Sequence, residues 1–66
     1  MTMTMAIAVP LFSELGKPWH PRMDVQVYAN DRSQLKVRLD CSFEGEWYGY
    51  VTNGPRTGER VRIQGH

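Results

Sequence analysis

The chain has 66 residues, with eight lysines and arginines against seven aspartates and glutamates, so its formal net charge is +1. A chain of this length forms at most one domain, and it buries only about 60% of the surface that its unfolded form exposes. The single cysteine excludes an internal disulfide. The near-neutral charge excludes a polybasic protein, so any nucleic-acid function would depend on where the charges lie.

Three residues are the usual candidates for metal ligands, and they lack the spacing that a metal site needs. Cys41, His20 and His66 form no paired motif such as CxxC or HxxxH. We therefore expect no structural metal and no cofactor. Small domains without a disulfide or a metal often depend on a partner, which is either another protein or a second copy of the chain.

The composition also bears on the compartment. No apolar run approaches the roughly 18 residues that a membrane span needs. The first twelve residues contain no basic segment and are interrupted by Pro10, so they do not predict a secretory signal. A lone thiol fits a reducing compartment. We expect a cytoplasmic protein that does not associate with membranes.

Apolar residues recur at every second position over most of the chain, which predicts strands. We divide the single domain of residues 1–66 into an N-terminal strand (1–9), a proline-rich connector (10–22) and a four-stranded antiparallel meander (23–64). The connector contains three prolines, which exclude a long helix and allow at most one short helical turn near residues 11–16.

The predicted fold class is all-β. The most economical arrangement is a small five-stranded antiparallel meander that curls into a barrel of the SH3-like or OB-like kind. An open sheet packed on the proline-rich segment is the alternative. In the meander, one face of each strand is apolar and forms the expected core: Met23, Val25, Val27, Ala29, Leu35, Val37, Leu39, Cys41, Phe43, Trp47, Gly49, Val51, Val61 and Ile63.

The stretch FEGEW decides which aromatic rings are buried. A two-residue loop, Glu44-Gly45, pairs Phe43 with Glu46 and turns Trp47 outward. A three-residue loop that also includes Phe43 places Gly45 in the left-handed conformation and pairs Cys41 with Trp47. We prefer the three-residue loop because it buries the indole and leaves the tyrosine hydroxyls accessible. It also pairs Leu39 with Gly49, Val37 with Val51 and Arg38 with Tyr50.

The same reasoning places the other two hairpins. A loop of residues 31–33 pairs Ala29 with Leu35, and the last hairpin pairs Val51 with Val61. Tyrosines and cations then alternate across the outer face of the sheet. The expected binding residues on this face are Tyr28, Lys36, Arg38, Tyr48, Tyr50, Arg60 and Arg62.

This outer face is compatible with three interpretations. A solvated face is the plainest, because Arg beside Tyr is a common cross-strand pair. Single-stranded nucleic acid could stack its bases on the tyrosines while the cations follow the phosphates. A protein partner suits the mixed charge best, because Tyr and Arg are enriched at interface hot spots. We favour a small binding module that docks on a larger protein, as an inhibitor, adaptor or accessory subunit.

An enzyme is not expected. Cys41 falls between apolar residues on the expected core face, and His20 lies between a tryptophan and a proline without a nearby acid. Glu44 and Glu46 flank a hairpin tip, where solvated carboxylates are common. The glycines of TNGPRTG do not follow the order of a phosphate-binding loop.

The first strand differs from the others because residues 3–9 are apolar or small on both faces. Such a strand is either enclosed within the fold or covered by another molecule. We expect burial within the monomer, with a homodimer through residues 3–9 as the alternative.

Overall fold

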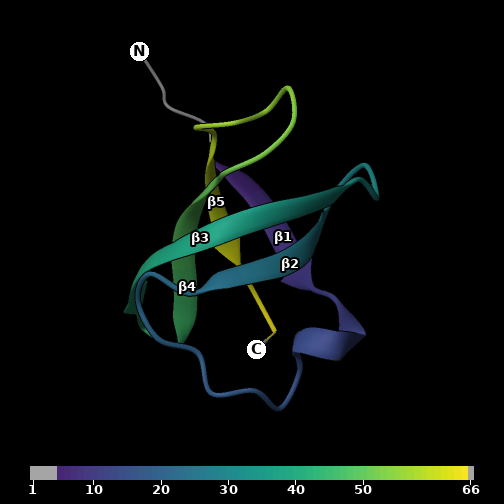
Figure 1. The fold of residues 1–66 in the computed structure, drawn as a ribbon. Helices are drawn as coiled ribbons and strands as arrows, with labels where there is room; N and C mark the ends of the chain where they lie inside the picture. Colours follow the sequence, from purple (N-terminus) through teal and green to yellow (C-terminus); the bar gives the residue numbers. More distant parts are fainter. Residues whose placement is uncertain (1–4, 66) are drawn as a thin grey trace.

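The alternating segments form five strands that close into a barrel, with one short 3-10 turn (Figure 1). The computed structural model describes residues 5–65, so residues 1–4 of the expected first strand and His66 lie outside the described part. The elements in chain order are β1 (Ala6–Pro10), η1 (Phe12–Glu14), β2 (Asp24–Ala29), β3 (Gln34–Phe43), β4 (Glu46–Val51) and β5 (Arg60–Ile63).

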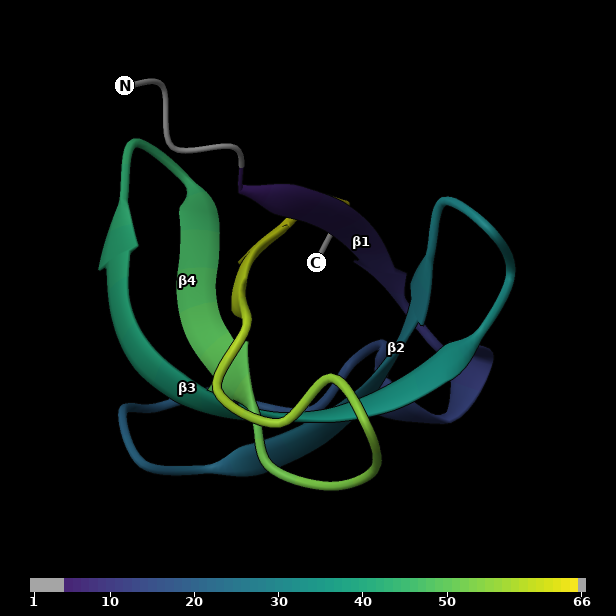
Figure 2. The same ribbon diagram turned by 90° about the horizontal axis from the view of Figure 1, so that it is seen from above.

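The strand order is β1-β2-β3-β4-β5, and the ring is closed by pairing β1 with β5 (Figure 2). Consecutive strands are antiparallel, so in a meander of five the first and the last strand point the same way. Their ladder is therefore parallel, with Ala6 opposite Val61 and Ala8 opposite Ile63. The prediction of an all-β five-stranded barrel is confirmed, and its closing ladder makes the sheet mixed.

The barrel interior is narrow and is filled mainly by β-branched side chains. Among residues 5–65, the largest side chains that are almost fully inaccessible to solvent are mostly valines: Leu39, Ile63, Val25, Val27, Val37, Val51 and Val61. β-branched residues suit the inward positions of a small barrel because they are bulky near the backbone and have few rotamers.

A β-bulge in β3 divides the β3–β4 hairpin into two registers. On the barrel side, Val37 lies opposite Val51 and Leu39 opposite Gly49, as predicted from the three-residue loop. Beyond Leu39 the register shifts, so that Cys41 faces Tyr48 and Phe43 faces Glu46. An extra residue in one strand shifts the register by one and bends the strand.

The prediction of a three-residue loop at the hairpin tip is therefore wrong. The loop has two residues, and both Glu44 (φ 53°) and Gly45 (φ 80°) have positive φ angles, as a type I′ turn requires. Gly45 takes the left-handed conformation as expected. The bulge lets both registers exist in one hairpin. The tip has the register of a two-residue loop, and the part of the hairpin within the barrel has the register that was predicted from a three-residue loop.

The bulge also corrects the expected core. A one-residue shift moves every following side chain of β3 to the other face of the strand. Cys41 is consequently exposed, and Phe43 is 64% exposed, whereas both had been expected in the core. Trp47 keeps its inward position opposite Ile63 and packs, partly buried, against the core.

The other two hairpins are offset by two residues from their predicted registers. Val27 rather than Ala29 lies opposite Leu35, and Gly49 rather than Val51 lies opposite Val61. An even offset preserves which side chains point inward, so the predicted faces survive while the individual neighbours change.

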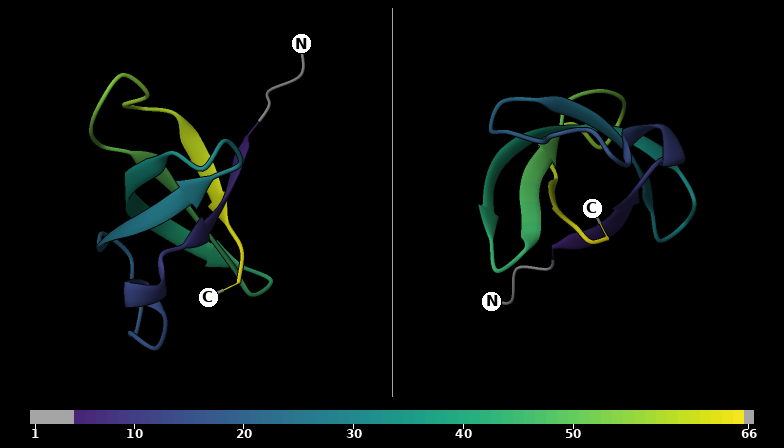
Figure 3. Two further views of the ribbon diagram at one scale, coloured as in Figure 1. Left: turned by 90° about the vertical axis from the view of Figure 1, so that its right-hand side faces the viewer. Right: turned by 90° about the horizontal axis from the view of Figure 1, so that it is seen from below.

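The proline-rich connector runs along one end of the barrel (Figure 3), where backbone hydrogen bonds from Leu11 to Gln26 and from Arg22 to Leu39 attach it. Two side-chain contacts hold it as well. Trp19 is buried, and its ring meets Trp47 edge-on with centroids 6.2 Å apart. The carboxylate of Glu14 accepts a hydrogen bond of 2.6 Å from the backbone N–H of Gln26 and one of 3.0 Å from Lys17 Nζ. Glu14, which follows β1 in the chain, thus provides a hydrogen-bond acceptor for a backbone N–H group of β2.

Replacing Gly49 with alanine tests the close approach of β3 and β4. A Cβ atom at this position would lie 2.3 Å from the backbone oxygen of Arg38 and 2.7 Å from Val37 Cγ1. We expect Gly49→Ala to lower the free energy of unfolding by about 2 kcal/mol or more, measured by urea denaturation.

The control is Gly45→Ala, whose Cβ meets nothing within 4 Å. It should cost only the roughly 1–2 kcal/mol of a left-handed alanine, and a smaller loss for Gly49→Ala than for Gly45→Ala would contradict this account.

Glu14 should make the stability of the fold depend on pH. Burial by itself would raise the pKa of Glu14, but the hydrogen bonds from Gln26 and Lys17 leave it below the ordinary value of 4.5. A lowered carboxyl pKa adds stability above the unfolded pKa, and this stability is lost as the pH falls through the folded pKa.

We expect Glu14→Gln to destabilise the fold at pH 7 by about 1–3 kcal/mol, because the side chain is only 8% exposed. The difference from the unmodified chain should shrink as the pH is lowered below 4.5. Denaturation curves between neutral and acid pH measure both effects. Glu44→Gln, at the exposed hairpin tip, is the control and should change neither. A constant difference at all pH values would contradict the assignment.

Candidate binding surface

The outer side of the barrel carries a row of alternating charged and aromatic side chains across four strands. Asp24 on β2 lies opposite Arg38 on β3, Arg38 lies opposite Tyr50 on β4, and Tyr50 lies opposite Arg60 on β5. In the next row, Tyr48 lies between Cys41 and Arg62. The two rows are adjacent because Tyr48 and Tyr50 are two residues apart on one strand.

Five of the seven predicted binding residues are brought together by these rows, on β3, β4 and β5. We call them the tyrosine–arginine face: Arg38, Tyr48, Tyr50, Arg60 and Arg62. Lys36 borders the face, two residues from Arg38 along β3. Tyr28 lies outside it, because its ladder neighbours are Val9 and Gln34.

Ion pairs accompany each arginine of the tyrosine–arginine face. Arg38 binds Asp24 with two hydrogen bonds of 3.0 and 3.2 Å, a fork that fixes the guanidinium plane. Arg60 Nη1 lies 3.3 Å from Asp40 Oδ2, and Arg62 Nε lies 3.7 Å from Glu46 Oε1. The carboxylates come from strand positions beside the face, so the face has mixed charge.

The pKa values follow these contacts. The hydrogen bond from Arg38 lowers the pKa of Asp24, and the same bond raises the pKa of Arg38, to which Tyr50 adds a smaller contribution. Both charges are therefore present at neutral pH. The bulge has a part in this arrangement, because its extra residue, Asp40, is the carboxylate that pairs with Arg60.

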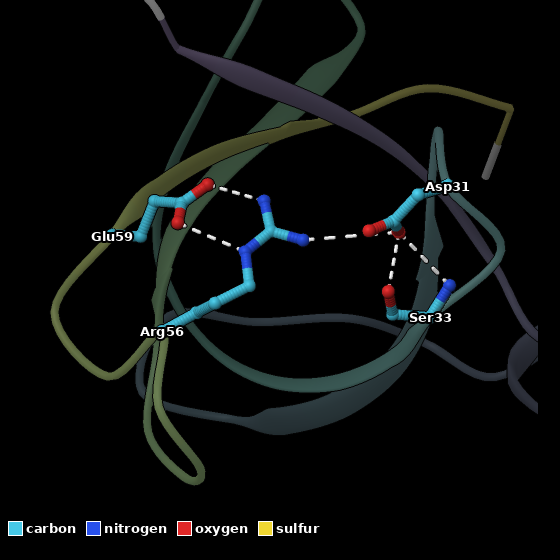
Figure 4. A network of polar contacts seen from close by, with 4 residues as sticks. All are labelled: Asp31, Ser33, Arg56 and Glu59. Carbon is cyan, nitrogen blue, oxygen red and sulfur yellow. Dashed lines mark hydrogen bonds and ion pairs between the residues drawn. The ribbon is translucent and has the colours of Figure 1, made fainter.

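Sequence reasoning missed a polar network at the opposite end of the barrel from the connector (Figure 4). Arg56, in the β4–β5 loop, binds both carboxylate oxygens of Glu59 and lies 3.9 Å from Asp31 in the β2–β3 loop. Asp31 also accepts hydrogen bonds from the backbone N–H and the hydroxyl of Ser33. Arg56 thus links two loops that are far apart in the sequence, so no local pattern could have predicted the contact.

The charges of this network are reinforced by its hydrogen bonds. The hydroxyl and backbone N–H of Ser33 lower the pKa of Asp31, and the guanidinium of Arg56 lowers the pKa of Glu59. The hydrogen bonds that Arg56 donates to Glu59 raise the pKa of Arg56. Sequence reasoning also missed Glu14 as a buried carboxylate, because its partner Gln26 is twelve residues away.

The other residues that could form a metal site, a pocket or a reactive group are dispersed over the barrel. Within residues 5–65, no three His, Cys, Asp or Glu side chains gather as a metal site. Helices in the described part of the chain are too short to cross a bilayer. Two hollows, of about 180 and 300 Å³, lie around Gln26 and Lys36, and a third of about 300 Å³ lies beside Ile7. His20 and Cys41 are both exposed.

Comparison with known protein families, curated proteins and solved structures gave no match to this chain.

Replacing Arg56 with methionine tests whether it couples the two loops. The variant keeps an apolar stem and removes the contacts with Asp31 and Glu59. We expect amide hydrogen exchange at Arg32 and Ser33 to become roughly two- to fivefold faster, as for the loss of an exposed ion pair. Thr57→Ala is the control, because it alters only a hydrogen bond to Gly54 within the β4–β5 loop. Unchanged exchange in Arg56→Met would mean that the loops are independent.

Proposed function

We propose that this chain is a non-enzymatic binding module of the cytoplasm. It docks on a larger protein or complex through the tyrosine–arginine face, as an inhibitor, an adaptor or an accessory subunit. The observation that carries the proposal is the pairing of each arginine of the face with a carboxylate. A surface of this kind offers donors, acceptors and aromatic area together, with little net charge.

The composition of the face supports a protein ligand. Tyr and Arg bring a large contact area with few rotatable bonds, and both are enriched among the residues that dominate protein–protein binding energies. The forked bond between Arg38 and Asp24 fixes the guanidinium before a partner arrives, which lowers the entropic cost of binding. The half-buried rings of Tyr48 and Tyr50 are restrained in the same way by their cross-strand neighbours.

The position of the face supports it further. The hollows lie around Gln26 and Lys36 and beside Ile7, and their linings do not include the five residues of the face. A small molecule is usually bound in a concave site that surrounds it. An outward sheet surface suits a partner with a surface of its own.

Single-stranded nucleic acid remains the second candidate, and it has one observation in its favour. Tyr48 and Tyr50 project from the same side of β4, with Arg62 and Arg60 opposite them on β5. Aromatic rings flanked by cations on a barrel surface are what base stacking and phosphate contact require. Asp24, Asp40 and Glu46 oppose this function, since each would repel a phosphate chain at the arginine that it accompanies.

A double substitution tests the protein-binding proposal. Tyr50→Ala combined with Arg60→Ala removes two facing side chains at the centre of the tyrosine–arginine face. The partner is first identified by capture from an extract of the native host and is then purified. We expect the double variant to raise the dissociation constant roughly thirtyfold or more, measured by calorimetry, with an unchanged far-UV circular dichroism spectrum.

Phe43→Ala is the control, because this exposed aromatic ring lies outside the face, and the variant should bind the partner normally. Equal binding by the double variant and the control would place the contact elsewhere. Titration with a labelled single-stranded oligonucleotide at two salt concentrations addresses the second candidate. Micromolar binding that weakens steeply with salt, and that strengthens in Asp24→Asn with Asp40→Asn, would support nucleic acid in place of a protein.

A further inference from the structure

The outer face of β1 has a pattern that no other strand of the barrel shows. In β1 the small residues Ala6 and Ala8 point toward the core, and the larger apolar residues Ile7 and Val9 point outward. Each other strand carries polar or charged residues on its outer side: Asp24 and Gln26 on β2, Lys36 and Arg38 on β3, Glu46, Tyr48 and Tyr50 on β4, and Arg60 and Arg62 on β5.

The apolar surface continues at both ends of β1. Six large apolar side chains in the described part of the chain are exposed. Met5, 38% exposed, precedes the strand, and Val9, 48% exposed, lies in it. Phe12, 88% exposed, follows it in η1, and Tyr28 is the ladder neighbour of Val9. Leu15 follows η1, and only Phe43 lies on a distant hairpin.

We propose that this surface binds a second copy of the chain. We call it the β1 face, and its residues are Met5, Ile7, Val9, Phe12 and Tyr28. An apolar strand face on a small domain, among strands with polar outer faces, is typical of a surface that another molecule covers. β1 already pairs with β2 on one side and β5 on the other. The second copy therefore binds through side chains and not by adding a strand.

The β1 face is complementary to itself. The outward positions 5, 7 and 9 are evenly spaced, so a two-fold axis through Ile7 places Ile7 against Ile7 of the second copy and Met5 against its Val9. The same patch then serves both subunits, as a two-fold dimer requires. The five residues of the face carry no charge, and the whole chain has a net charge of only +1, so two copies repel each other weakly.

The size of the barrel fits a dimer of the standard kind. Such a dimer buries about 800 Å² on each subunit, about a sixth of the 4623 Å² that the barrel exposes. The β1 face supplies the apolar centre of such an interface, and Arg62, which lies beside Ile7 in the closing ladder, supplies part of a polar rim. The hollow of about 300 Å³ between Ile7 and Arg56 gives the facing copy a recess for a side chain.

This inference does not rest on the proposed function, and the two surfaces are compatible. The two faces meet at the β1–β5 ladder, where Ile7 lies opposite Arg62, whereas Arg38, Tyr48 and Tyr50 lie on β3 and β4, which do not pair with β1 (Figure 2). A dimer formed through β1 would present two copies of the tyrosine–arginine face, and a partner with two sites would bind it with an increased effective concentration.

Sedimentation equilibrium of the full chain, from micromolar to millimolar concentration, tests the inference. We expect the mass to rise with concentration from 7.6 kDa to twice that value. Val9→Lys should raise the dissociation constant of the dimer at least roughly tenfold, because it places an unpaired charge in the apolar centre. Phe43→Lys is the matched control, since it makes the same kind of change at an exposed position on the β3–β4 hairpin, whose strands do not pair with β1, and it should dimerise normally.

Met5→Lys provides a second variant that lies outside the strand ladders, and it decides the question if Val9→Lys proves to be unfolded by circular dichroism. A chain that stays monomeric at millimolar concentration would overturn the inference, including the case in which that monomer binds neutral phosphatidylcholine vesicles through the same residues. Equal dimerisation of Met5→Lys, Val9→Lys and Phe43→Lys would also overturn it.

Discussion

The close contact between β3 and β4 at Gly49 is the constraint on which the rest of the barrel depends. A glycine opposite Leu39 lets the two backbones approach to a distance that a Cβ atom would prevent. Immediately beyond this contact β3 takes up an extra residue, and its register against β4 shifts by one. A bulge bends its strand and increases the local twist, and both are needed to close a sheet of only five strands.

That single extra residue connects the fold to the candidate surface. It places Asp40 outside the barrel, where its carboxylate meets Arg60. It also turns Cys41 and Phe43 outward on the hairpin beyond the barrel. The mixed charge of the tyrosine–arginine face therefore depends partly on the way in which β3 bends. If β3 were straight, the tyrosine–arginine face would contain the same residue types, but the arginines would have different neighbours.

The narrow interior has a consequence on the other side of the ring. Valines, two leucines and one isoleucine from four strands fill the barrel, and the inward positions of β1 are alanines. The larger apolar residues of β1 point outward, so the strand reverses the usual pattern of large residues inside. The two sides of the barrel thus offer different chemistry: mixed charge with tyrosines on β3, β4 and β5, and an uncharged apolar strip on β1.

The sequence by itself determined the fold class, the division of the meander strands into inward and outward residues except in β3 beyond Leu39, and the register of Val37, Arg38 and Leu39 against β4. These features follow from the alternation of side chains, which is local and insensitive to an offset of two residues. Only the tertiary structure decided the bulge, the two-residue loop, the loop contact of Arg56 with Asp31 and the capping of Gln26 by Glu14. Each of these features either joins residues that are distant in the chain or depends on a choice between two turn geometries. The closure of the barrel determines which geometry the chain adopts. The alternation of side chains along a strand contains no information about where that strand must bend.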